Sequence, residues 1–210
     1  MRLTVFGATG GTGGRVVRQA LAAGHEVTAV VRGEHALPAH RNLHVVTADV
    51  MDPAAIEKAV TGADAVLDTI GAREQGPTTV AADAARSITG AMRAAGTRRF
   101  VIVSNSAGTP GPGDEPFTRF VVKPLVLRPL LRHSLDDMAR AEAVVRETDL
   151  DWTIVRAPQL TDKPGRGGYR TAAERNVTFG IRISRDDLAT CLLSLIDDTA
   201  SLRSHITVAN

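Results

Sequence analysis

Short apolar runs alternate along this chain with longer stretches in which apolar residues recur every three or four positions. The short runs predict strands at residues 3–6, 27–31, 43–46, 65–67, 100–103, 153–155 and 205–208. The longer stretches predict helices at residues 15–23, 54–60, 79–95, 135–146 and 187–196. Apolar strands that take turns with helices are typical of a mostly parallel, doubly wound sheet covered on both faces. The pattern therefore predicts one three-layer α/β domain over residues 1–210.

Residues that cap helices lie at several boundaries of these elements. Ser134 with Asp137 and Ser184 with Asp187 have the spacing of a capping box, so each pair predicts a helix start. Gly96 follows a predicted helix, at the position where a left-handed residue commonly ends one.

Residues 108–133 interrupt the alternation. This segment holds five of the ten prolines of the chain, and proline interrupts it too often for one helix. It follows a predicted strand and so leaves the sheet at its carboxyl edge, where open α/β folds bind ligands. We expect a substrate lid here; a self-association surface and plain packing are the alternatives.

Residues 161–182 form a second irregular segment, rich in glycine and arginine. Residues 169–171 and 177–179 within it have the composition of short strands. We expect this segment to form the other wall of the same cleft, on the substrate side.

Three glycines directly after the first predicted strand suggest a cofactor. Gly7, Gly10 and Gly13 suit a tight turn, a close approach of backbone to a pyrophosphate, and close packing of helix on strand. The helix that begins there offers its N-terminus to an anion. The loop predicts dinucleotide binding and a Rossmann fold; a merely structural glycine-rich turn is the alternative.

The end of the second predicted strand distinguishes NAD from NADP. NAD-preferring folds place a carboxylate there, whereas this chain has Arg32, which matches a 2′-phosphate with charge-assisted hydrogen bonds. We therefore expect NADP(H) rather than NAD(H), although Arg32 beside Glu34 and His35 also fits a solvated strand end.

Residues after the third and fourth predicted strands extend this site. Asp49 and Val50 are placed to meet the adenine, although Asp49 also suits a turn cap. Residues 69–72 are expected to pass beneath the adenosine ribose and the nicotinamide half, with Gly71 allowing close approach.

Composition narrows the class of protein. The chain is 43% apolar and 23% charged over 210 residues, which excludes collagen, disorder and a disulfide scaffold. A net charge of +2 argues against nucleic-acid binding. No apolar stretch reaches the roughly 20 residues that span a bilayer, and the single cysteine, Cys191, lies in an apolar run that favours burial in a reducing compartment. We expect a soluble, cytoplasmic protein without nucleic-acid, membrane or metal partners, as a monomer or small homo-oligomer.

These segments together resemble the atypical short-chain dehydrogenase/reductase group, in particular the NADPH-dependent flavin reductase (biliverdin-IXβ reductase) family, with NmrA-type proteins as relatives. The similarity extends over almost the whole chain and is most specific at residues 6–13, 24–32, 48–50, 77–80, 104–107 and 183–188. It implies cofactor contacts at Gly7, Thr9, Gly10, Thr12, Arg32, Asp49, Val50, Ile70, Gly71 and Ser104. To these we add Ala8, Gly11, Gly13 and Pro158.

The same resemblance indicates two catalytic candidates. Ser106 matches the family's active-site serine, although its hydroxyl also suits a strand end, and Gln159 is placed to orient the nicotinamide or to be a plain loop residue. Met138 and Gln159 stand where the family carries histidines, and the 108–133 segment is longer than the family's lid.

One departure constrains the chemistry. Most short-chain dehydrogenases use a Tyr-x-x-x-Lys pair as general acid, but the only tyrosine here is Tyr169, and Ala173 stands four places after it. Hydride delivery to a simple ketone needs a positioned proton donor, whereas a planar conjugated acceptor can take its proton from water. We therefore expect an NADPH-dependent oxidoreductase whose small-molecule substrate is a flavin, a quinone or a tetrapyrrole. The alternatives are a non-catalytic NAD(P)-sensing protein of the NmrA type and an epimerase or isomerase relative.

Overall fold

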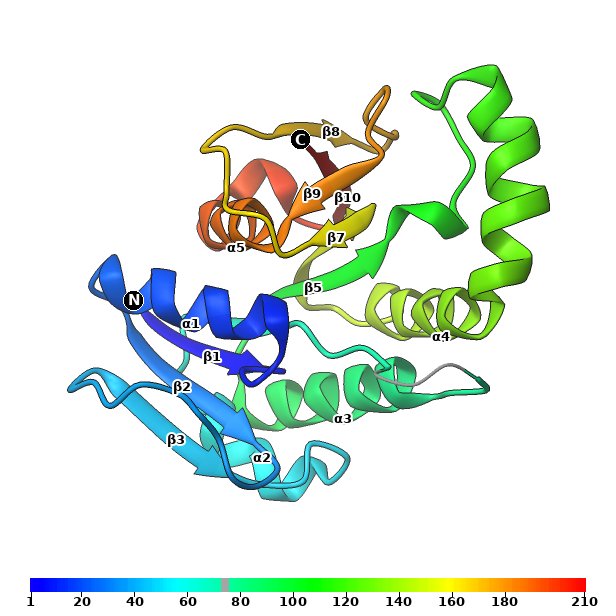
Figure 1. Ribbon diagram of the computed structural model, residues 1–210. Coiled ribbons are helices and arrows are strands. Elements are labelled where there is room, and N and C mark those ends of the chain that lie inside the picture. The colour runs from blue at the N-terminus through cyan, green and yellow to red at the C-terminus, as the bar shows by residue number, and fades with distance from the viewer. Residues whose placement is uncertain (73–75) are drawn as a thin grey trace.

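A computed structural model describes residues 1–72 and 76–210 and is built around a twisted sheet (Figure 1). In this part of the chain the sheet has eight strands in the order β3-β2-β1-β4-β5-β6-β10-β8, and only the pairing of β8 with β10 is antiparallel. The strands are β1 (Arg2–Phe6), β2 (Glu26–Val31), β3 (Leu43–Thr47), β4 (Ala65–Asp68), β5 (Arg99–Asn105), β6 (Asp151–Ala157), β8 (Arg170–Ala173) and β10 (Ser204–Ala209). The predicted mostly parallel sheet is confirmed.

Helices cover both faces of the sheet. α1 (Gly11–Ala22) and α5 (Arg185–Ser194) pack on one face. α2 (Pro53–Val60), α3 (Val80–Ala95) and α4 (Arg128–Arg146) pack on the other (Figure 1). Short 3-10 turns, η1 (Ser106–Gly108) and η3 (Thr199–Ser201), join the elements. The result is the predicted three-layer α/β arrangement.

The buried side chains form one apolar cluster on each face. Along β1, Leu3 and Val5 pack toward α1 and α5, and Phe6 packs toward α2 and α3. Cys191 is fully buried in the first cluster, as its apolar surroundings predicted, and burial raises the pKa of its thiol to about 12. No helix in the described residues combines the length and the apolar character needed to cross a membrane.

Two of the three cap predictions are confirmed. The Ser184 hydroxyl accepts a hydrogen bond from the Asp187 amide at 3.0 Å and begins α5, and Gly96 ends α3 with φ +72°. The capping box at Ser134 is wrong, because Ser134 lies inside α4. Its partner Asp137 instead accepts from the amide of Ala81 at 2.9 Å and so caps the N-terminus of α3. A cap supplied by another helix has no fixed spacing in the sequence.

Residues 108–133 do not form one helix, as their proline content predicted, because residues 109–115 are not helical. The helical second half of the segment was not expected. A π-helix, η2 (Thr118–Leu127), continues directly into α4 and stands out from the sheet (Figure 1). Pro124 lies inside η2, where the wider π turn accommodates a residue that cannot donate to the ordinary helical ladder. Pro129 lies in the first turn of α4, where proline is tolerated.

The 161–182 segment contains β8, is flanked by the short strands β7 (Gln159–Thr161) and β9 (Arg182–Ser184), and borders the carboxyl edge of the sheet. β7 pairs in parallel with β9, and β8 covers the strand predicted at 169–171 with a shift of one to two residues. The strand predicted at 177–179 is wrong, because these residues form a turn in which the Gly180 amide donates to the Val177 carbonyl at 2.9 Å. Phe179 has φ +55°, which is incompatible with a strand.

Candidate functional site

The predicted site residues follow the carboxyl ends of the parallel strands. The chain runs from β1 outward to β3 and then returns to β4 on the other side of β1. Such a reversal of strand order opens a crevice at the carboxyl edge, where doubly wound folds bind ligands. The loop after β1 and the loop after β4 meet at this point.

The Thr69 side chain leaves no room for a Cβ at Gly7 or Gly13, so both positions require glycine. A Cβ added to Gly7 would lie 2.6 Å from Thr69 Oγ1, and one added to Gly13 would lie 2.7 Å from the same oxygen and overlap the Gly7 carbonyl. Gly7 also has φ +74°, which favours glycine. The loop therefore holds β1, α1 and the loop after β4 in close contact.

The N-terminus of α1 fits a dinucleotide pyrophosphate. Its N-cap, Gly10, makes no side-chain cap, and the first turn carries no acidic residue. The first amides of a helix point outward without intrahelical partners and favour an anion. Together with the close-packed glycines, this open helix end fits NAD(P) at the loop formed by Gly7, Ala8, Thr9, Gly10, Gly11, Thr12 and Gly13.

Two arginines beside this loop did not figure among the predicted contacts. A Cβ added to Gly11 would lie 2.8 Å from Arg185 Nε, so the Arg185 side chain lies directly against the loop, where Asp162 pairs with it at 2.8 Å. Arg15 donates to the Gly11 carbonyl at 2.7 Å. Arg185 belongs to the 183–188 segment that carries the family resemblance, which was the available clue.

The adenosine end of the predicted site lies after β2 and β3. Arg32 directly follows β2, is exposed, and forms no ion pair with any described residue. Asp49 Oδ1 accepts from the Met51 amide at 3.0 Å, which is the turn-capping alternative, and Val50 is buried against the α2 and α3 cluster. Arg32 is therefore the group most available to a ligand at this end.

The predicted nicotinamide end lies after β4 and β5. A Cβ added to Gly71 would lie 3.3 Å from Met138 Cε, so α4 approaches the loop that contains Gly71. Ser104 and Met138 border a hollow of about 80 Å³ between β5 and α4. Position 138, where the related family carries histidine, thus lies beside the predicted cofactor loop.

A buried carboxyl group lies at the end of β4. Asp68 is 1% exposed and accepts from the Ile70 amide at 2.8 Å, while the Ile70 side chain packs on the α2 and α3 cluster. Burial raises the pKa of Asp68 to about 7, although the Ile70 hydrogen bond opposes the shift.

The Ser104 hydroxyl is hydrogen-bonded to a residue of α4 and is therefore not open to a ligand. Its hydroxyl donates to Glu142 Oε1 at 2.7 Å, and Arg156 Nε donates to the same oxygen at 2.9 Å. Burial raises the pKa of Glu142, but the hydrogen bonds from Arg156 and Ser104 outweigh it, and the net pKa is lowered. His205 lies beside this pair, and burial together with the Arg156 charge lowers its pKa.

The two catalytic candidates lie on neighbouring strand ends. Ser106 is buried in η1 after β5, and its hydroxyl makes no hydrogen bond within the described residues. Gln159 is exposed after β6 and the buried Pro158, and its amide donates to the Ile181 carbonyl at 3.3 Å. Register pairs Asn105 with Ala157, so the two strands end side by side.

Tyr169 does not lie among these groups. Its ring packs on the α1 and α5 cluster, and its hydroxyl lies 3.2 Å from Ser194 Oγ on α5. The single tyrosine is thus a packing residue in this structure.

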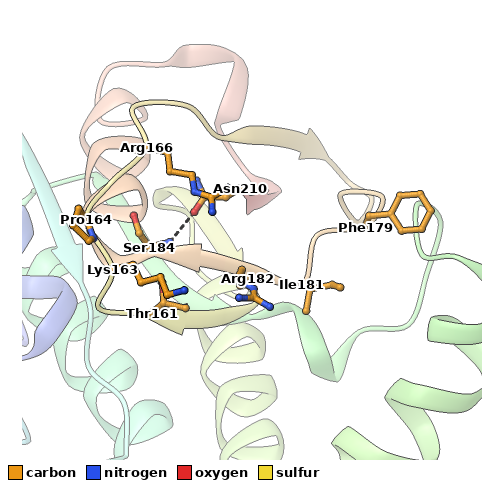
Figure 2. Close-up of a pocket in the computed structure, with 9 residues that line it drawn as sticks. All are labelled: Thr161, Lys163, Pro164, Arg166, Phe179, Ile181, Arg182, Ser184 and Asn210. Atoms are coloured by element: carbon orange, nitrogen blue, oxygen red, sulfur yellow. Dashed lines mark hydrogen bonds between the residues drawn. The ribbon is translucent and has the colours of Figure 1, made fainter.

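A second, larger hollow lies beyond Gln159, between β9 and the loop after β7 (Figure 2). Its volume is about 240 Å³, and three basic side chains, Lys163, Arg166 and Arg182, line it with Phe179 and Ile181. The sequence predicts a cleft wall in this segment, but its residue pattern does not distinguish these three cations from the other arginines and lysines.

The strand order and the glycine cradle, which is the loop of residues 7–13, define a Rossmann-type protein. A family profile described as NAD(P)H-binding matches residues 7–199, so the chain belongs to this NAD(P)H-binding family.

Solved structures share the whole fold. The oxidoreductase ylbE of Lactococcus lactis matches with a TM-score of 0.85 at 21% identity, covering 100% of this chain and 91% of that chain. A short-chain dehydrogenase/reductase of Veillonella parvula in complex with NADP gives 0.81 at 21% identity, with coverage of 100% and 94%. The anaerobillin reductase ChuY of Escherichia coli gives 0.77 at 21% identity, with coverage of 100% and 97%.

Proposed function

We propose that this protein is an NADPH-dependent reductase that transfers hydride to a planar conjugated acceptor, such as a flavin, a quinone or a tetrapyrrole. One observation carries the proposal: the glycine cradle, Gly71, Ser106 and Gln159 share one edge of the sheet, whereas the only tyrosine is engaged with Ser194. The site thus combines a dinucleotide cradle with the lack of a tyrosine acid.

NADP rather than NAD is favoured by Arg32. This exposed guanidinium stands at the end of β2 without a carboxylate partner among the described residues, where a 2′-phosphate would supply one. The Veillonella parvula structure in complex with NADP supports the same choice by analogy of fold.

The acceptor class follows from the missing acid. When bound, NADPH supplies a hydride, and the reduced acceptor also needs a proton. A conjugated acceptor spreads the incoming charge and takes that proton from water, so the protein contributes mainly proximity and orientation. Ser106 donates a hydrogen bond to the nicotinamide amide or to the acceptor, and Gln159 orients the nicotinamide. The description of ChuY as an anaerobillin reductase supports a conjugated acceptor.

Stopped-flow nicotinamide absorbance tests the proposal. The protein is mixed with NADPH or NADH, each with and without FMN and a small quinone. We expect acceptor-dependent oxidation that is faster with NADPH. Tight NADPH binding without oxidation by any of these acceptors would overturn the reductase.

The second candidate is a sensor that binds NAD(P) and reports to a protein partner. The feature that favours it is the 108–133 segment, which exposes Phe117 and Phe120 at 67% each and Leu130 at 74%. Binding without turnover in the stopped-flow experiment would favour this function.

A further inference from the structure

We propose that the hollow lined by Lys163, Arg166 and Arg182 is a subsite for an anionic group of the acceptor, a phosphate or a carboxylate. This inference rests on the proposed reductase function and names the acceptor's second recognition element. The hollow lies directly after β7, which begins with Gln159 at the predicted nicotinamide end. It is therefore positioned to hold the part of an acceptor that extends beyond the reacting ring.

The three cations have no anionic partners of their own. None of Lys163, Arg166 and Arg182 forms an ion pair with any residue in the described ranges. A protein surface ordinarily intersperses both signs of charge. Three unpaired cations around one hollow create a local positive potential that attracts an anion.

The acidic residues nearest in the chain do not neutralise them. Asp162 pairs with Arg185 at 2.8 Å and with Arg15 at 3.3 Å. The buried Asp187 accepts from the Ser184 hydroxyl at 2.8 Å and from Asn210 Nδ2 at 2.8 Å. Asp162 is thus paired with arginines outside the hollow. Asp187 is bonded to neutral donors and keeps its single negative charge, which the three cations of the hollow outnumber.

The other end of the hollow is apolar and leads toward the predicted nicotinamide. Phe179 and Ile181 are 69% and 66% exposed there, and the Ile181 carbonyl accepts the Gln159 amide. Figure 2 shows Phe179 and Ile181 at one end of the lining and Arg166 beside Asn210 at the other, with Arg182 between them. This arrangement suits a ligand with a flat apolar ring and a charged tail.

FMN and riboflavin provide a matched pair of probes, because they carry the same ring and differ by one phosphate. Binding of each oxidised flavin is measured by quenching of its fluorescence in the presence of NADP⁺. We expect FMN to bind about tenfold or more tightly than riboflavin, because charge-assisted hydrogen bonds to the phosphate are available to FMN alone. Menadione and a carboxylate-bearing naphthoquinone, compared by their KM, show whether a carboxylate is accepted as well as a phosphate.

Two variants localise the effect. Arg182→Gln and Lys163→Gln change exposed side chains, so folding is expected to persist and is checked by thermal unfolding. Each should weaken FMN binding by roughly tenfold and leave riboflavin within twofold. Arg93→Gln, which removes an exposed cation from α3 on the opposite face of the sheet, is the control and should change neither.

The outcomes separate this inference from the reductase function. Equal affinity for FMN and riboflavin, or equal losses for both in Arg182→Gln, would overturn the anionic subsite even if both flavins oxidise NADPH. An Arg182-dependent preference for FMN without NADPH oxidation would support the subsite as a binding site and overturn the reductase.

Discussion

Arg156 on β6 donates two hydrogen bonds to the carboxylate of Glu142 on α4, one from Nε at 2.9 Å and one from Nη2. The Ser104 hydroxyl on β5 completes the set. The three side chains fasten α4 to the carboxyl ends of two neighbouring strands, next to the predicted nicotinamide position. The network therefore fixes α4 to the sheet at Glu142, one turn after Met138.

Removing Glu142 tests this fastening. Glu142→Ala should lower the free energy of unfolding by about 3 to 5 kcal/mol, because it leaves the Arg156 charge largely buried without its partner. Urea unfolding measures the change. The control is Glu174→Gln, whose exposed carboxylate pairs with His205 and whose loss should cost about 1 kcal/mol or less. Equal small effects would mean that the Glu142 pair does not stabilise the fold.

Gly13 and Gly90 both lie in helices, but substitution by alanine should have opposite effects on stability at the two positions. A Cβ at Gly13 overlaps the Gly7 carbonyl, so Gly13→Ala should cost about 1 to 3 kcal/mol and weaken NADPH binding. A Cβ at Gly90 meets nothing closer than 3.9 Å, so Gly90→Ala should stabilise α3 by up to about 1 kcal/mol. Thermal unfolding and NADPH titration of both variants measure the contrast. A harmless Gly13→Ala would remove the steric argument for the cradle.

Arg32→Ala should separate the two dinucleotides. We expect NADPH affinity to fall by about 1.5 to 3 kcal/mol, because charge-assisted hydrogen bonds to the 2′-phosphate are lost, while NADH affinity stays nearly unchanged. Isothermal titration of both cofactors measures this difference. Arg41→Ala, an exposed cation that precedes β3, is the control. Equal losses for NADPH and NADH would exclude Arg32 from the phosphate site.

Asp68 makes stability depend on pH. The pKa of Asp68 is about 7 in the folded state and about 4 in the unfolded state. Between these values the unfolded state releases the proton more readily than the folded state does. The free energy of unfolding therefore falls as pH rises from about 4 to about 7. Asn keeps an acceptor for the Ile70 amide and removes the charge. Asp68→Asn should therefore raise the free energy of unfolding by about 2 to 4 kcal/mol at pH 8 and by less at pH 5.

Urea unfolding at the two pH values checks the Asp68 prediction. Asp197→Asn, the same substitution at an exposed carboxylate, is the control. A gain from Asp68→Asn that is equal at both pH values would show that Asp68 does not titrate between them.

A buried ion pair lies within residues 108–133, and Asn176 from the 161–182 segment is hydrogen-bonded to its carboxylate. Lys123 Nζ lies 2.9 Å from Asp114, whose carboxylate also accepts from Asn176 Nδ2 at 2.8 Å. Burial lowers the pKa of Lys123, and Asp114 partly opposes the shift.

The two partners of this ion pair should differ in cost. Asp114→Ala leaves the buried Lys123 cation without its anionic partner and should lower the free energy of unfolding by about 3 to 5 kcal/mol. Lys123→Met should cost less, since Asp114 keeps its bonds from Asn176 and the Gly111 amide at 3.0 Å. Urea unfolding ranks the variants, and limited proteolysis reports on residues 108–133. The reverse order would show that Asp114 does not depend on these neutral donors.

The local spacing of apolar residues predicted most of the fold. The alternation of short apolar runs with helical stretches predicted the layers and the parallel sheet, because the spacing of apolar residues within each strand or helix shows which face is buried. The same reasoning failed at Ser134 and at 177–179, where a distant partner or a single backbone angle decides the conformation. Proline content gave no sign of η2, since a π turn accommodates Pro124.

The sequence by itself determined the cofactor loop, its place after the first strand, the arginine at the end of the second strand and the absence of a tyrosine acid. These features depend on residue type and spacing along the chain. Tertiary structure alone decided that Glu142 holds Ser104, that Arg185 covers Gly11, and that Lys163, Arg166 and Arg182 surround one hollow. Those contacts join segments that lie far apart or follow no regular pattern, so only the packing of the whole chain brings them together.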